Sequence, residues 1–149
     1  MPYDLTHRQE MVLAALAAEG GASFAPVQLQ KLFFVLDENI SDEWGGRQFD
    51  FEPYDYGPFD KAVYQEFEAL ERLGLAQTVY DGPSAGARSY SLTLDGQQIG
   101  EKALSLLPGT TRDYITQLSS WVRALSFAEL VGAIYRAYPD MRENSVFQE

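Results

Sequence analysis

The chain has 149 residues, of which 46% are hydrophobic and 22% charged, so it is long enough and apolar enough to build one hydrophobic core. It contains no cysteine, which excludes disulfides, thiolate metal sites and catalysis by a thiol. Its formal net charge of −11 works against binding to duplex DNA or anionic membranes, because both are polyanions. Neither a secretory leader nor an apolar run of roughly 20 residues is visible, so we expect a cytoplasmic protein without a membrane partner.

Two helices are predicted within the first 40 residues. The first begins at Thr6, whose spacing to Gln9 is that of a capping box, and it ends at Gly20-Gly21. The second runs from about Pro26 to about Ile40. Apolar residues recur along it at spacings of three and four, which places them on one buried face: Leu29, Leu32, Phe33, Leu36 and Ile40.

Residues 49–53 alternate apolar with acidic side chains, a pattern typical of a short strand with one buried face. The proline at position 53 favours an edge strand. A turn at residues 54–58 follows, and Pro58 suits the first turn of a helix that extends to about Leu73. On this interpretation Phe59 belongs to the buried face of that helix.

The second half of the chain is predicted to contain a hairpin and three helices. Strands at 76–80 and 88–92 are joined by residues 81–87, which are rich in turn formers. Helices follow at 94–107, 111–124 and 126–138, and the last of them begins with a capping box formed by Ser126 and Glu129. The apolar face of this last helix can close the core or form a homodimer interface.

The order of these elements predicts an α+β, mainly helical protein with a winged helix-turn-helix-like core and a two-stranded wing. We expect one domain over residues 1–149. Its parts are the core at 6–107, a C-terminal helical pair at 110–139 and a polar tail at 140–149.

Three stretches, taken in this order and spacing, resemble a group of small bacterial proteins. They are Leu29-Gln30-Lys31-Leu32-Phe33-Phe34, the segment from Phe51 to Phe59 with its Tyr56-Gly57-Pro58 turn, and Tyr90-Ser91-Leu92-Thr93-Leu94-Asp95-Gly96. The group comprises the YwgA-like proteins and the related SocA-like Panacea domains, and the similarity covers about residues 25 to 100. The resemblance implies an antitoxin or adaptor that contacts its partner protein directly, in toxin–antitoxin, phage-associated or regulatory settings.

Catalytic chemistry finds little support in the sequence. His7 is the single histidine, and no nucleophile or carboxylate is indicated beside it. Asp50, Glu52 and Asp55 are candidate ligands of a divalent cation, but they lack EF-hand spacing, and acids that alternate along a strand more often face solvent. We therefore expect no enzyme, no metal and no cofactor, and keep a metal-dependent hydrolase as a third alternative.

The segment around residues 49–60 carries the leading prediction, a protein-binding surface. From Asp37 to Asp60 there are eight acids and one base, a net charge of −7. Tyrosine is enriched in interface hot spots, and surrounding acids favour a basic partner such as a toxin with a basic surface. The alternative for the aromatic residues is that they close the core around the turn. The predicted partner-binding residues are Phe51, Tyr54, Asp55, Tyr56, Phe59 and Asp60.

A winged-helix DNA-binding regulator is the main alternative function. Its candidate contacts are Lys61 and Arg72 on the third helix and Arg88 on the wing. The segment from Pro58 to Leu73 nevertheless holds four acids and two bases, where phosphate contacts need cations.

Overall fold

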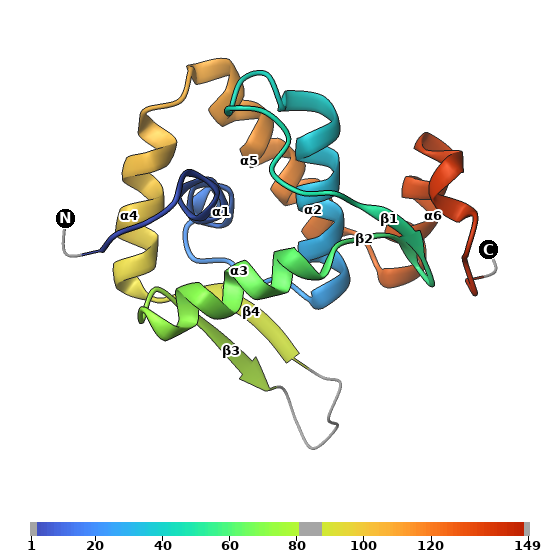
Figure 1. Cartoon of the computed structure of the whole chain (residues 1–149), viewed down its shortest axis with the longest axis horizontal. Helices are drawn as coiled ribbons and strands as arrows, with labels where there is room; N and C mark the ends of the chain where they lie inside the picture. The colour runs from blue at the N-terminus through green and yellow to red at the C-terminus, as the bar shows by residue number, and fades with distance from the viewer. Residues whose placement is uncertain (1–2, 81–87, 148–149) are drawn as a thin grey trace.

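The computed structural model describes residues 3–80 and 88–147, so the predicted hairpin tip at 81–87 lies outside the described residues. The fold is α+β and mainly helical. The described residues form six α-helices, one short 3-10 helix and two separate two-stranded antiparallel sheets (Figure 1). None of their helices combines the length and the hydrophobicity needed to cross a membrane.

The first helix, α1 (His7–Ala17), begins at the predicted capping box. The Thr6 hydroxyl accepts a hydrogen bond from the backbone N–H of Gln9, and the Gln9 side chain accepts one from the backbone N–H of Thr6, both at 3.1 Å. The helix ends three residues before Gly20, and both Gly20 and Gly21 adopt positive φ in the turn that follows.

The second helix, α2 (Pro26–Ile40), lies at the centre of the molecule. It contacts α5 (Gly109–Ala124) and strand β2 (Gly57–Phe59). The predicted apolar face is buried, but so is every position from Leu29 to Asp37, including three polar side chains. A helix enclosed on all sides leaves no face for polar residues, and this places Gln30, Lys31 and Asp37 in the interior.

The region between residues 49 and 60 differs from the prediction. Strand β1 is Glu52–Tyr54 and pairs with β2 (Gly57–Phe59) in a hairpin, with Glu52 opposite Phe59 and Tyr54 opposite Gly57. The assignment of Pro58 to the first turn of a helix is therefore wrong, because Gly57 adopts a φ of 103° that reverses the chain into a second strand. The predicted alternation of buried and exposed side chains is present at its start, since Phe49 is buried and Asp50 is exposed.

Helix α3 (Lys61–Arg72) starts later than predicted, at a cap provided by Asp60. The carboxylate of Asp60 accepts hydrogen bonds from the backbone N–H groups of Ala62 (2.9 Å) and Asp50 (2.8 Å). The Asp60 side chain therefore caps the N-terminus of α3 and also binds the backbone of Asp50, just before β1.

The second hairpin has the predicted bounds, with β3 (Ala76–Tyr80) pairing antiparallel to β4 (Arg88–Leu92). The middle of β4 is joined to the core through Phe24 and Tyr90, whose backbone groups exchange two hydrogen bonds of 2.8 Å. Helix α4 (Leu94–Ser105) follows directly and packs along α1.

The C-terminal helices cover α2. Helix α5 packs against α1 and α2, whereas α6 (Phe127–Ala137) packs against α2 and β2 (Figure 1). The predicted capping box of Ser126 and Glu129 is present. After η1 (Pro139–Arg142), the predicted polar tail binds the first hairpin: the backbone N–H of Val146 donates to the carbonyl of Asp55 at 2.9 Å.

Candidate functional site

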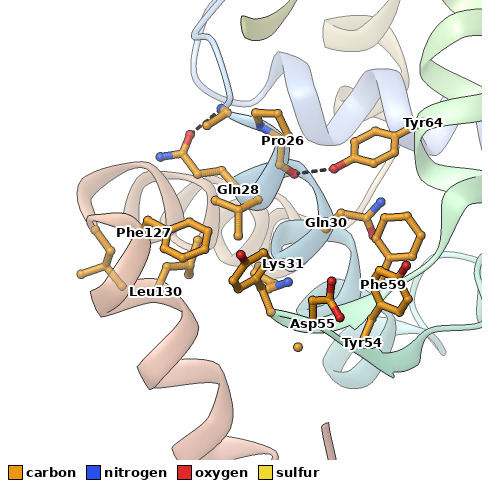
Figure 2. A pocket seen from close by; sticks show the side chains of 15 residues that line it. Pro26, Gln28, Gln30, Lys31, Tyr54, Asp55, Phe59, Tyr64, Phe127 and Leu130 are labelled. Atoms are coloured by element: carbon orange, nitrogen blue, oxygen red, sulfur yellow. Dashed lines mark hydrogen bonds between the residues drawn. The ribbon is translucent and has the colours of Figure 1, made fainter. Parts of the chain in front are cut away.

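A pocket of about 460 Å³ opens between the start of α2, the first hairpin and the start of α6 (Figure 2). We call it the aromatic pocket, because its walls are mostly aromatic and aliphatic: Pro26, Val27, Tyr54, Tyr56, Phe59, Tyr64, Leu125, Phe127 and Leu130. Its polar side chains are few, namely Gln28, Gln30, Lys31 and Asp55. A concave apolar surface with a few convergent polar groups is the usual composition of a binding site.

Three large aromatic side chains at the rim of this pocket are exposed. Tyr54 is 55% exposed, Tyr56 46% and Phe127 44%. Tyr54 stacks on Phe59 with ring centroids 5.2 Å apart, and Tyr56 meets Phe127 edge to face at 5.1 Å. The rings are therefore supported by neighbours but not covered, which makes them a preorganised contact surface.

The structure places four of the six predicted partner-binding residues in the aromatic pocket: Tyr54, Asp55, Tyr56 and Phe59. Phe51 instead faces inward and packs edge to face on Phe34, with ring centroids 5.4 Å apart. Asp60 is occupied as the cap of α3, so its carboxylate serves the backbone.

The aromatic pocket also contains a lysine that sequence reasoning did not identify. Lys31 is only 3% exposed, and its Nζ donates a hydrogen bond to the carbonyl of Pro58 at 3.1 Å. Within the described part of the chain it forms no ion pair. Burial in these apolar surroundings lowers the pKa of Lys31 from 10.5 to about 8, because desolvation disfavours the ammonium form.

Helical geometry explains why Lys31 was missed. At 100° per residue, position 31 points away from the face that carries Leu29, Leu32 and Leu36. Such a lysine is expected to be solvated. Here the β1–β2 hairpin and α6 cover that opposite face. The one available sequence signal was a lysine within a run of large apolar residues.

Two polar contacts fix the remaining walls. Gln30 and Asp60 exchange two hydrogen bonds of 3.0 Å between the Gln30 side-chain amide and the Asp60 backbone, which ties α2 to the end of β2. The hydroxyl of Tyr64 donates to the carbonyl of Pro26 at 3.2 Å (Figure 2). Burial raises the pKa of Tyr64 to about 12, so this hydroxyl remains a donor at physiological pH.

Asp55, at the hairpin turn, has a free carboxylate and an anchored backbone. Its carbonyl accepts hydrogen bonds from the N–H of Val146 and, at 3.3 Å, from the hydroxyl of Ser145. Its carboxylate makes no hydrogen bond or ion pair with any other described residue. Figure 2 shows the Asp55 and Lys31 side chains bordering the same space.

A smaller acidic pocket of about 400 Å³ lies on the other side of Tyr54 and Phe59, which line both pockets. Its other lining residues are Asp50, Glu52, Asp60 and Lys61. The candidate metal ligands are therefore divided, since Asp50 and Glu52 line this acidic pocket and Asp55 lines the aromatic one. Over residues 3–80 and 88–147, no three side chains of the ligating types are grouped so that they could hold a metal ion.

The candidate DNA contacts do not form one surface. Lys61 and Arg72 lie in the first and last turns of α3, about 16 Å apart along a helix of twelve residues. Arg88 is engaged with Tyr90, whose hydroxyl accepts a hydrogen bond of 2.6 Å from Nε. Acidic side chains line the same pockets: Asp50, Glu52 and Asp60 beside Lys61, and Glu68 and Glu71 beside Arg88.

The loop that leads to the first hairpin is held by His7 and Asp37. Nε2 of His7 lies 2.7 Å from the carbonyl oxygen of Trp44, which gives this histidine a structural contact. Asp37 is fully buried, and its two carboxylate oxygens accept hydrogen bonds from the N–H groups of Gln48 (3.0 Å) and Phe49 (2.9 Å). Burial raises the pKa of Asp37, although these two bonds oppose the shift.

No model of a known protein family matches the chain, and no curated protein matches it. The resemblance to Panacea-domain proteins, and the antitoxin or adaptor role that it implies, therefore stay hypotheses. The basis for a functional proposal is the aromatic pocket, its exposed rim and the charges around it.

Proposed function

We propose that this protein is a non-enzymatic protein-binding module, antitoxin- or adaptor-like, that holds its partner at the aromatic pocket. The observation that carries the proposal is the exposed aromatic rim formed by Tyr54, Tyr56 and Phe127 around an apolar cavity. Aromatic anchors at the centre of an interface contribute most of its binding energy when a partner covers them. The size of the pocket suits one or two side chains of a partner.

The charges beside the pocket favour a basic partner. Asp55 stands at its edge with an unpaired carboxylate, and the exposed Asp50 and Glu52 line the adjoining acidic pocket. A net charge of −11 adds a long-range attraction for cationic surfaces. The partner we propose therefore presents an apolar side chain flanked by lysine or arginine, as a toxin with a basic surface would.

We interpret residues 6–107 as a winged-helix-like core in which β3–β4 is the wing, following the order of the elements. The DNA-binding alternative has less support, because Lys61, Arg72 and Arg88 are separated and two of them share pockets with acids. We propose that the first hairpin, and not the wing, is the recognition element.

The test compares partner capture by three purified variants. Tyr56→Ala and Asp55→Lys should each reduce, by at least tenfold, the amount of the partner retained on immobilised protein, with a thermal midpoint close to that of the wild type. Tyr80→Ala is the matched control, since Tyr80 is 67% exposed on the second hairpin and should leave capture unchanged. If Tyr56→Ala and Asp55→Lys unfold the protein, or if all three variants capture alike, the proposal is wrong.

A further inference from the structure

A buried ammonium group with a single neutral partner calls for an explanation. Nζ of Lys31 can donate three hydrogen bonds. Among the described residues the carbonyl of Pro58 is its one hydrogen-bond acceptor, and no carboxylate lies within 4.0 Å. If holding the Pro58 carbonyl were its only role, a neutral amide would serve without the desolvation penalty of a charge. The position of Lys31 in the lining of the aromatic pocket points to an anionic ligand group there.

The rest of the pocket restricts what carries that anion. Apart from Gln28, Gln30 and Asp55, its other walls are aromatic and aliphatic, so the ligand has an apolar body of about one or two residues joined directly to the negative group. Asp55 at the edge of the pocket, and Asp50 and Glu52 in the adjoining acidic pocket, repel a segment with further negative charge. A C-terminal carboxylate meets these conditions, because it is an anion next to an apolar side chain on a chain that can otherwise be basic.

We infer that the aromatic pocket binds the C-terminus of its partner: Lys31 pairs with the terminal carboxylate while the last side chain, an apolar one, packs between Tyr54, Tyr56 and Phe127. This inference rests on the proposed protein-binding function and specifies which part of the partner is recognised. Basic side chains that precede the last residue then lie against Asp55 and the acidic pocket.

Asp55 does not cancel the attraction of Lys31 for the carboxylate. Asp55 is half-buried at the turn, where water screens its charge, whereas the amine of Lys31 is enclosed by apolar groups and screened far less. Three tyrosines, Tyr54, Tyr56 and Tyr64, also line the pocket, and the hydroxyl of Tyr64 is already bonded to the carbonyl of Pro26.

The test is fluorescence anisotropy with two labelled hexapeptides that end in Lys-Arg-Phe, one as the free acid and one as the C-terminal amide. We expect the wild-type protein to bind the acid at least about tenfold more tightly than the amide, the ratio that a charge-assisted hydrogen bond provides. Lys31→Gln keeps a donor for Pro58 but no charge, and should bring the ratio close to one. Lys61→Gln, which removes an exposed lysine outside the pocket, should preserve it.

The wild-type ratio does not depend on how any variant folds. If the acid and the amide bind equally well and Tyr56→Ala weakens both, the carboxylate site is wrong while the protein-binding proposal stands. If neither peptide binds, the C-terminal site is wrong, and the capture experiment decides the broader proposal by itself. If free 3-phenylpropionate displaces the acid peptide with equal affinity, the ligand is a small carboxylate and the inference of a partner C-terminus fails.

Discussion

The first hairpin, β1–β2, has shorter strands than the second, β3–β4, and its turn is held by the C-terminal segment. It lies between α2 and α6, η1 contacts both of its strands, and the C-terminal segment binds its turn (Figure 1). The second hairpin contacts helices α1 to α4 and is bridged to Phe24 through Tyr90 in the middle of β4, but the end of β3 projects away from the molecule and leaves Val79 and Tyr80 exposed.

This difference supports the proposal that the first hairpin is the recognition element. A binding pocket gains affinity when its side chains are ordered before the ligand binds, and the packing of the β1–β2 hairpin orders Tyr54 and Tyr56. The projecting hairpin offers Arg88, already engaged with Tyr90 and next to acidic side chains. The stability of the two hairpin bases can be tested separately, by variants that affect one and leave the other intact.

The largest effect is expected at the base of the second hairpin, for Gly96→Ala. A Cβ at Gly96 would lie 1.8 Å from the backbone oxygen of Leu75, and backbone cannot move aside as a side chain can. We expect the free energy of unfolding to fall by at least about 3 kcal/mol in urea titrations. Gly109→Ala is the control, since its nearest neighbour is the flexible end of Arg112 at 3.5 Å, and it should change stability by less than about 1 kcal/mol. Equal stabilities of the two variants would contradict the close crossing of α4 over Leu75.

A smaller loss is expected on the approach to the first hairpin, for Asp37→Asn. An asparagine offers one acceptor where the N–H groups of Gln48 and Phe49 need two, and its amide places a donor against a donor. The expected loss is about 1 to 3 kcal/mol, measured by the same titration. Asp42→Asn, an exposed residue in the following loop, should be neutral within about 0.5 kcal/mol. A neutral Asp37→Asn would show that the carboxylate does not anchor this segment.

The smallest effect is a pH dependence that belongs to Lys31 at the floor of the aromatic pocket. Its pKa is about 8 in the folded protein and near 10.5 when unfolded, so the unfolded chain binds more protons between these values and stability rises with pH. Between pH 8 and 9.5 the gain should be about 1.5 kcal/mol. Lys31→Met should remove the rise and Lys61→Met should retain it. A stability that stays flat in the wild type would mean that the amine is solvated.

Local features were predictable from the sequence wherever the interaction partners are neighbours in the chain. The capping boxes at Thr6 and Ser126 and the bounds of β3 and β4 follow from short-range spacing, and the structure has them. The alternation after residue 48 also gave the burial of Phe49. The start of the third helix was wrong because Pro58 suits a strand edge as well as a first helical turn, and the choice depended on pairing with Glu52–Tyr54.

The sequence by itself determined the α+β, mainly helical class, the absence of cysteine, and the position of two tyrosines at a turn rich in acids, whereas their exposure was left open and is given by the structure. Only the tertiary structure decided that Lys31 is buried, because periodicity along α2 describes one helix and not what covers its far side. It also brought Phe127 against Tyr56 from a distant part of the chain. A binding pocket depends on such long-range contacts, whose energies come from packing between elements and leave no pattern within either one.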